Sequence, residues 1–353
     1  LYTYLQYFIS NQPEVFDLRT VIKPIYIILS ILGLCPYSFK TNRLKLSIVP
    51  KSIYLNFMCA ISFILLMSVF SVIHIYYIFY VLTDNAMTEG VLARVNYVTE
   101  MFFLLIFVFV AYTNLYKNRV KLMYILHNLS VKIDTPNPNS ILILKNLRFQ
   151  VNFVVIGSLT ALLIVQVVIN TTRDDSWWKI VLVDFTFLLP QMIQFCLISF
   201  FYIIMVSVEE LLKSVRKCNI PQVFEYNKVE NVKRVEAKKS IPDIRQVELI
   251  YLDILKIIQY TTRVFEAPFL VIVLQCLHSV VAQVQILYDG IAVQSSLSVH
   301  DILNCSIWTT YQYLKIYVMG KAGAVLKLEV RRSTIFKYLY LSTYPIKIIN
   351  VFI

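Results

Sequence analysis

The chain has 353 residues, of which 58% are apolar and 15% are charged, against roughly 45–50% and about 25% in an ordinary soluble domain. This composition and a mean hydropathy of +0.67 exclude a typical water-soluble enzyme and predict that lipid solvates much of the protein. The formal charge of +12 does not indicate nucleic acid, because the basic residues are scattered between apolar runs instead of being gathered on one soluble face.

Residues 1–52 are predicted to form a cytoplasmic segment ahead of the first membrane span. Within it, Ile25–Leu34 is too short to cross a bilayer and is bracketed by Pro24 and Pro36. That pattern predicts an interfacial or re-entrant helix. The chain begins at Leu1, without the basic start and cleavage site of a signal peptide, and we expect its natural N-terminus to be missing.

Seven apolar segments follow, each near the roughly 20 residues that a helix needs to cross a bilayer. Five are strongly apolar: Ile53–Val81, Ala93–Tyr116, Gln150–Thr171, Ile180–Val208 and Ala267–Leu287. The sixth, Ile302–Gly320, carries Lys315 near one end, where its stem is expected to snorkel to the lipid headgroups. The seventh is Thr334–Ile353. The predicted fold is therefore all-α: a polytopic membrane protein with seven transmembrane helices.

The distribution of Lys and Arg predicts the orientation of this bundle. Successive segments outside the spans hold six, none, six, two, eleven, none and six of them. These segments are 1–52, 82–92, 117–149, 172–179, 209–266, 288–301 and 315–338. Because cytoplasmic loops carry the positive excess, the N-terminus is predicted inside and the C-terminus outside. This orientation is opposite to that of a G-protein-coupled receptor.

Three regions are predicted along the chain. The segment 1–52 precedes a six-helix transmembrane bundle over 53–320, and 321–353 forms a cytoplasmic turn and a final helix. Long cytoplasmic extensions, 117–149 and 209–266, have apolar residues at helical spacing among mixed charges. Two interpretations of them stay open: an inner bundle that holds subunits together, or an amphipathic face on anionic lipid.

Polar and aromatic residues concentrate in the predicted outer halves of the spans. An outward-opening cavity for a small molecule would produce this pattern, since polar groups inside a span need protein or water beside them. Glu100 and Asp184 are the strongest candidates, because a carboxylate within a span needs a partner, while His278 also fits a hydrogen-bonded histidine of the bundle. The candidate ligand-binding residues are Tyr97, Glu100, Asp184, Gln191, His278, Trp308 and Tyr311.

Signatures of catalysis and of cofactor binding are absent from the sequence. There is no G-x-S-x-G, no H-E-x-x-H and no phosphate-binding glycine loop. The six cysteines form no C-x-x-C pair and no metal-ligand spacing with histidine. We therefore expect neither an enzyme nor a cofactor nor a metal site.

The last span contains a pattern known from one family. Its Thr343-Tyr344 pair is followed by five residues, by Asn350 and by Val351-Phe352. This resembles the Thr-Tyr, five apolar residues and Gln-Phe of insect gustatory receptors, which are related to the odorant receptors. The segment Leu32–Phe39 is also similar to that family's Gly-x-x-Pro-aromatic segment.

The resemblance implies a ligand-gated, non-selective cation channel built from four subunits, as a homo- or hetero-tetramer. Each subunit would bind a small-molecule tastant, and the last helix would line the pore. By position in the motif, Thr343 and Tyr344 lie inward, Asn350 faces the pore near the gate, and Val351 and Phe352 form its apolar seal. The implied location is the plasma membrane of sensory neurons, with the lipid membrane as the protein's other partner.

Two other classes remain as alternatives. A G-protein-coupled receptor also has seven helices but needs an outside N-terminus, against the charge distribution. A secondary transporter is expected to show repeated halves and glycine-interrupted spans, and the sequence has neither, with only 6 glycines.

Overall fold

The computed structural model describes most of the helical part of the chain. The described residues are 18–35, 37–42, 45–50, 53–78, 91–133, 145, 147–149, 184–225, 244–293, 299–343 and isolated positions between 157 and 182. Most of the predicted span Gln150–Thr171 lies outside the described residues. So do most of 134–149, in the predicted extension 117–149, and all residues after Thr343.

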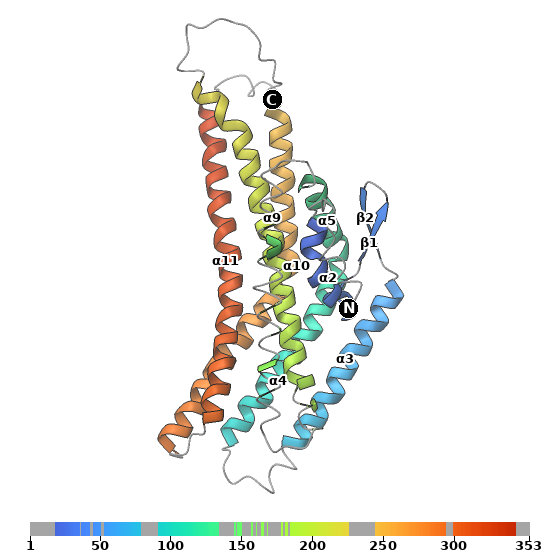
Figure 1. Cartoon of the computed structure of the whole chain (residues 1–353), viewed down its shortest axis with the longest axis vertical. Coiled ribbons are helices and arrows are strands. Elements are labelled where there is room, and N and C mark those ends of the chain that lie inside the picture. The colour runs from blue at the N-terminus through green and yellow to red at the C-terminus, as the bar shows by residue number, and fades with distance from the viewer. Residues whose placement is uncertain are drawn as a thin grey trace, which may run out of the picture.

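Long helices run side by side along the longest axis of the molecule (Figure 1). In chain order the elements are α2 (Leu18–Ile31), β1 (Tyr37–Asn42), β2 (Lys45–Pro50), α3 (Ile53–Tyr76), α4 (Val91–Lys117), α5 (Arg119–Ile133), the π-helix η4 (Asp184–Leu188), α9 (Leu189–Glu225), α10 (Ile244–Tyr288), the π-helix η5 (Asp289–Val293) and α11 (Val299–Thr343). The predicted helical bundle is confirmed for these residues.

One small antiparallel hairpin, which the sequence analysis did not predict, joins α2 to α3. Its register pairs Tyr37 with Pro50 and Asn42 with Lys45. Two tyrosines fix the chain that leads into it: Tyr112 of α4 donates to the Leu32 carbonyl, and Tyr26 of α2 donates to the Tyr37 carbonyl over 3.0 Å. The segment with the Gly-x-x-Pro-aromatic pattern is therefore tied to the helical bundle.

Four of the helical stretches that the structure describes are long and apolar enough to cross a membrane. They are Phe57–Tyr76, Arg94–Lys117, Phe185–Lys213 and Leu249–Ala292, and they correspond to the first, second, fourth and fifth predicted spans. The α11 helix, which contains the predicted sixth span, is not among the four. The total of seven spans stays a prediction.

The turn predicted after Gly320 is wrong. Instead, α11 is one continuous helix of 45 residues that runs through Gly320 and Gly323 to Thr343. The residues that follow Gly323 are mostly good helix formers, and the helix contains no proline, so two glycines are too few to end it. The final helix of the prediction therefore begins as an extension of α11.

The ends of the bundle differ in charge. The 82–92 and 288–301 connections hold no Lys or Arg. The helix ends that flank them lie at the lower end of the bundle in Figure 1, where α3 ends, α4 begins and α10 approaches α11. The end of α9 and the start of α10, which flank the most basic connection, lie at the opposite end (Figure 1). The charge alternation in the sequence thus corresponds to the two ends of the folded molecule.

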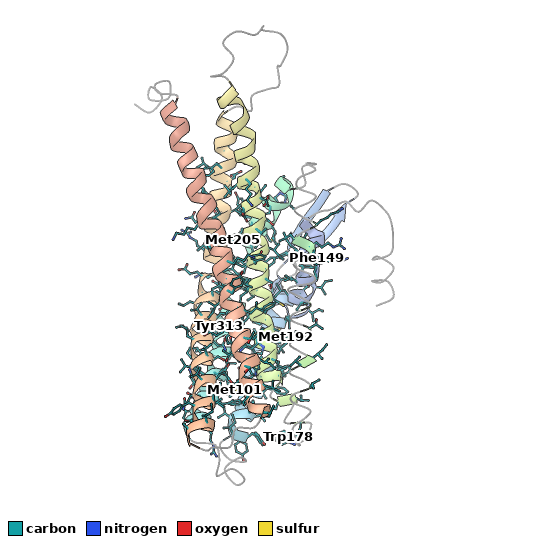
Figure 2. The ribbon with its side chains drawn as sticks, turned by 60° about the vertical axis from the view of Figure 1, so that its left-hand side comes forward. Met101, Phe149, Trp178, Met192, Met205 and Tyr313 are labelled. Carbon is teal, nitrogen blue, oxygen red and sulfur yellow. The ribbon has the colours of Figure 1, made fainter. Side chains whose placement is uncertain are left out.

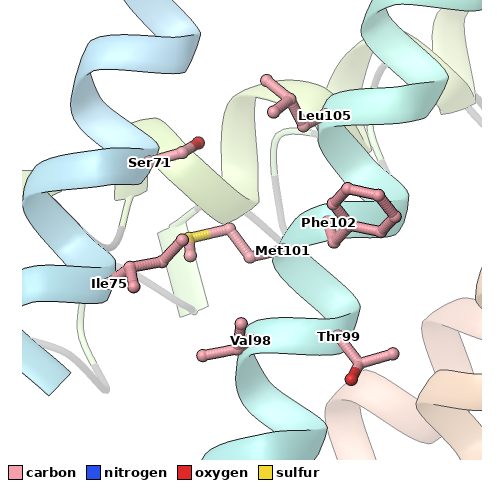
Figure 3. A pocket seen from close by; sticks show the side chains of 7 residues that line it. All are labelled: Ser71, Ile75, Val98, Thr99, Met101, Phe102 and Leu105. Carbon is pink, nitrogen blue, oxygen red and sulfur yellow. The ribbon is translucent and has the colours of Figure 1, made fainter. Parts of the chain in front are cut away.

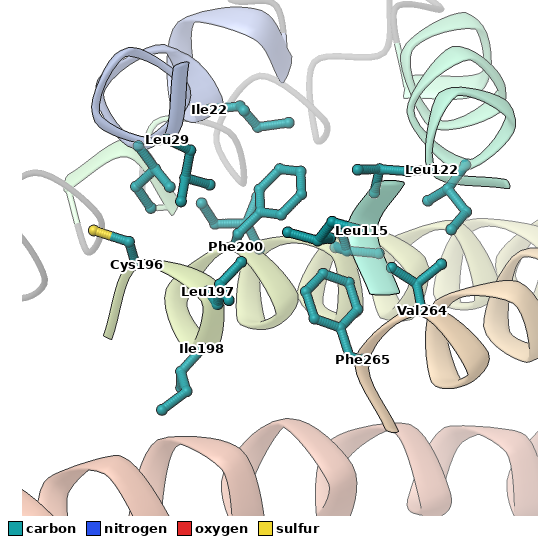
Figure 4. Packing of buried hydrophobic residues seen from close by; sticks show 14 of the residues in the cluster. Ile22, Leu29, Leu115, Leu122, Cys196, Leu197, Ile198, Phe200, Val264 and Phe265 are labelled. Atoms are coloured by element: carbon teal, nitrogen blue, oxygen red, sulfur yellow. The ribbon is translucent and has the colours of Figure 1, made fainter. Parts of the chain in front are cut away.

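The α9 helix is the centre of the bundle. It packs against α2, α4, α5, α10 and α11, and 72% of its membrane-length window is buried, against 17% for α3. Phe200 of α9 packs on Phe265 of α10, with ring centroids 6.2 Å apart, at the middle of the largest apolar cluster (Figure 4). Within a bilayer, where lipid is as apolar as these rings, such contacts stabilise the bundle through van der Waals packing.

The α3 helix instead presents apolar side chains outward. Exposed large residues on it are Leu65, Leu66, Val69, Val72 and Ile73. An exposed apolar face on a helix of membrane length is typical of contact with lipid or with another protein. It is consistent with the lipid-solvated surface that the composition predicts.

The interfacial helix predicted near the N-terminus is present but differently placed. As α2 it begins at Leu18, and its apolar residues Val21, Ile22, Ile25 and Leu29 are at most 2% exposed. The helix packs against α5 and α9, so this face is buried in protein. The predicted helix boundary at Pro24 is wrong, because α2 continues through it, and the interfacial or re-entrant position stays a prediction. The length of the segment and its flanking prolines predicted a short helix, but they do not say what covers its apolar face.

Gly33 ends α2 in a backbone conformation that favours glycine. Its φ is +71°, and two hydrogen bonds close the helix end, from Gly33 N to Ser30 O over 3.2 Å and from Leu34 N to Leu29 O over 2.8 Å. This is a Schellman cap with Gly33 just past the helix end. A Cβ at this position would lie 2.9 Å from the Cβ of Cys59 in α3, so the absent side chain also permits close packing.

We predict that Gly33→Ala lowers the thermal midpoint of the purified protein, because the substitution adds about 1 kcal/mol or more of left-handed strain and a contact with α3. Gly320→Ala is the matched control: a Cβ there meets nothing within 4 Å, and alanine favours the helix. An equal or smaller loss for Gly33→Ala than for Gly320→Ala would contradict this account of the cap.

Candidate functional site

A fully buried lysine lies between three helices. Lys315 of α11 is 0% exposed, and its Nζ donates to Gln191 Oε1, to Gln194 Oε1 over 2.7 Å and to Gln275 Oε1 over 3.3 Å. The ring centroid of Tyr311, one turn away, is 4.9 Å from the same nitrogen. An ammonium has three donors, and here three amide oxygens accept from it.

The prediction that Lys315 snorkels to the headgroups is wrong. Gln191 and Gln194 are three residues apart on α9, so both side chains reach one face of that helix, and Gln275 approaches from α10. These carbonyls replace water around the ammonium.

Gln275 connects Lys315 to a buried carboxylate. Its Oε1 accepts from Lys315, and its Nε2 donates to Glu100 Oε1 over 3.1 Å. Glu100 of α4 is 8% exposed. One amide therefore lies between the cation and the anion, and the resulting polar network joins α4, α9, α10 and α11.

Further groups extend this network along α10 and α11. Gln312 Nε2 donates to Ser279 Oγ over 3.2 Å, and Cys276 Sγ donates to Gln312 Oε1 over 3.2 Å. Tyr311 donates its hydroxyl to the Gln191 backbone carbonyl over 2.8 Å, with Trp308 against its ring. Together with Lys315, Gln191, Gln194, Gln275 and Glu100, these neighbours form the polar network.

A second cluster surrounds His74 of α3, which is 2% exposed. Its Nδ1 is 2.7 Å from Thr186 Oγ1 in η4. Because the Thr186 hydroxyl donates to the Leu182 carbonyl over 2.8 Å, Nδ1 carries the proton and donates to Thr186. The other nitrogen, Nε2, lies 3.4 Å from the Tyr97 hydroxyl, and the rings of Tyr97 and Phe187 pack against the imidazole.

The structure brings several of the predicted ligand residues together. Glu100, Gln191 and Tyr311 belong to the polar network with Trp308 beside it, and Tyr97 belongs to the His74 cluster. His278 donates through Nε2 to the Asn96 backbone carbonyl over 3.2 Å, the contact expected of a histidine that holds two helices together. Asp184 begins η4, and its side chain lies outside the described part.

The predicted pore residues fall at the end of the described chain. Thr343 is the last residue of α11, and Tyr344, Asn350, Val351 and Phe352 lie outside the described residues. Their roles stay predictions. The sequence analysis did not select Lys315, Gln194, Gln275 or His74 as site residues. The spacing of Gln191 and Gln194, which places both on one face of a helix, was a usable signal.

A groove of about 220 Å³ lies between α3 and α4 (Figure 3). Its lining is formed by Ser71, Ile75, Val98, Thr99, Met101, Phe102 and Leu105. The Thr99 hydroxyl is bonded to the Val95 carbonyl of its own helix, so Ser71 is the main polar group there. None of the predicted ligand residues lines this groove, which is an apolar feature of the α3–α4 face.

The polar network lies in one half of the bundle. Met192 follows Gln191, and Tyr313 is two residues from Lys315; both are nearer than Met205 to the end where α10 approaches α11 (Figure 2). That end carries the two connections without Lys or Arg. His74 is in the last turn of α3, which ends at the same end of the bundle (Figure 1). Both polar clusters are thus on the side of the bundle that the charge distribution assigns to the outside.

Residues 22–352 match the family model of the 7tm chemosensory receptors. The chain belongs to the 7tm chemosensory receptor family. This match over nearly the whole chain confirms the resemblance to receptors of the insect gustatory and odorant type. A comparison with curated proteins finds no match. The family is one of receptors and not of enzymes. The apolar helices of the chain are those of a membrane protein.

We predict that Thr186→Val destabilises the receptor, because it leaves the buried His74 Nδ1–H without its acceptor, at a cost of about 1–3 kcal/mol. The control is Thr113→Val on α4, whose exposed hydroxyl bonds only to carbonyls of its own helix; it should change stability by less than about 0.5 kcal/mol. Thermal unfolding of the purified variants measures both. Equal midpoints would show that the His74–Thr186 bond contributes nothing.

Proposed function

We propose that this chemosensory receptor is a gustatory-type, ligand-gated, non-selective cation channel of the plasma membrane in sensory neurons. The observation that carries the proposal is the position of the buried polar network and the His74 cluster near the end of the bundle where the two connections without Lys or Arg are flanked by helix ends. By the positive-inside rule that end faces outward, where a tastant arrives.

The ligand site of the proposal lies in this outer half. Tyr97, Trp308 and Tyr311 supply aromatic surface, and Glu100, Asp184, Gln191 and His278 supply hydrogen-bonding groups, the composition of a small-molecule site. Asp184 is at the start of a π-helix, an irregularity that often occurs at functional sites. A ligand opens the channel only if it binds the open arrangement more tightly than the closed one.

The channel of the proposal is a tetramer, homomeric or heteromeric. Helices α9, α10 and α11 are 37 to 45 residues long, about twice the length that a bilayer requires. The excess, at the basic end, supports a cytoplasmic anchor between subunits. The last span then lines the pore, with Asn350 near the gate and Val351 and Phe352 closing it by dewetting.

Topology and current test the proposal together. An epitope at residue 1 should stain only in permeabilised cells, and an epitope after residue 353 should stain in intact cells. Tastants should evoke a cation current that persists when G-protein signalling is blocked. An N-terminal tag exposed on intact cells, with responses that require G protein, would favour a G-protein-coupled receptor and overturn the proposal.

The two proposed sites predict different effects of two alanine substitutions. Asp184→Ala should shift the ligand concentration for half-maximal current several-fold while leaving single-channel conductance unchanged. Asn350→Ala should change conductance or ion selectivity with little effect on that concentration. Recording both quantities for both variants checks the assignment, and effects of the same kind from both variants would contradict it.

A further inference from the structure

Two amide groups of the polar network have no hydrogen-bond partner among the described residues. They are the Nε2 groups of Gln191 and Gln194, whose side chains are 1% and 0% exposed. Their orientation follows from chemistry: the Lys315 ammonium only donates, so each glutamine turns its oxygen toward Nζ and its NH₂ group away. An unsatisfied buried donor costs about 1–3 kcal/mol, so these two groups require an acceptor.

The charge around Lys315 is only partly compensated. Within the part of the chain that the structure describes, the three side-chain oxygens that accept from Nζ are neutral amides. The nearest carboxylate of the network, Glu100, is reached through Gln275. Neutral ligands leave an ammonium's charge in place, and a charge inside a membrane bundle is expensive unless it is paired.

The same arrangement strengthens the two unpartnered donors. An amide whose oxygen accepts a bond from a cation is polarised, so its N–H groups become better donors in a medium of low dielectric constant. Gln191 and Gln194 come from α9, whereas Glu100 comes from α4 with Gln275 between it and the ammonium. The two donors therefore lie beside the cation and on a different helix from the carboxylate.

We propose that this part of the polar network is a site for a small monovalent anion, which accepts hydrogen bonds from Gln191 Nε2 and Gln194 Nε2 in the field of Lys315. Two sources share this chemistry: an inorganic halide such as chloride, and the carboxylate group of a small organic molecule. The site does not depend on the channel proposal, because it concerns the stability of the folded bundle.

The test compares the thermal midpoint of the purified full chain in sodium chloride, sodium formate and sodium methanesulfonate at equal concentration. Unfolding is followed with a thiol-reactive fluorophore, since Cys35, Cys196 and Cys305 are buried. An anion that binds only the folded state raises the midpoint by mass action. We expect a rise of about 2 °C or more over methanesulfonate.

The ions separate the two sources. A rise in chloride alone assigns the site to a halide, and a rise in formate shows that a carboxylate enters it. Equal midpoints in the three salts overturn the proposal.

Variants separate binding at this site from general salt effects. In Gln191→Met/Gln194→Met the anion-dependent rise should disappear, whereas Gln283→Met, which changes a buried glutamine of α10 outside the network, should keep it. Gln194→Glu supplies a built-in carboxylate: its midpoint in methanesulfonate should exceed that of the wild type, and its anion dependence should be lost. If the double variant does not fold, Gln194→Glu decides, and an anion-dependent rise retained by either variant refutes the site.

Discussion

The arrangement of the bundle depends on one charge that has no access to water. Lys315 is completely buried, and the side-chain oxygens around its ammonium come from α9 and α10. A membrane interior supplies no water to replace them. The three helices must therefore keep a register that places Gln191, Gln194 and Gln275 around one nitrogen, and Gln275 extends the same constraint to Glu100 on α4.

The other features of the fold are consistent with this centre. The α9 helix, which contributes two of the three oxygens, is the most buried of the four candidate spans, and α3, which contributes none, is the least. The His74 cluster attaches α3 and η4 to α4 through short polar contacts and ring packing. The apolar cluster around Phe200 and Phe265 binds the same helices together without specifying their register, because apolar packing is less directional than hydrogen bonding.

The sequence predicted what depends on local composition. Hydropathy located α3, α4, α9 and α10, and a short apolar run between prolines located α2, because these signals lie within one segment. The environment of Lys315 depends on Gln191 and Gln194, which are more than a hundred positions away in the sequence. The sequence of its own span therefore predicted that the ammonium reaches water at the membrane surface. The predicted helix boundary at Pro24 and the predicted turn after Gly320 were also wrong, because α2 continues through the proline and α11 through two glycines.

The most direct test of the central role of Lys315 is a double-mutant cycle with Lys315→Met and Glu100→Gln, scored by the unfolding free energy of the purified chain. Each single substitution removes one of the two charged groups that Gln275 connects, whereas the double substitution removes both. The account predicts that the double variant loses less stability than the sum of the single losses, by about 0.5–3 kcal/mol. Additive losses would show that the two charges do not act through Gln275 as one unit.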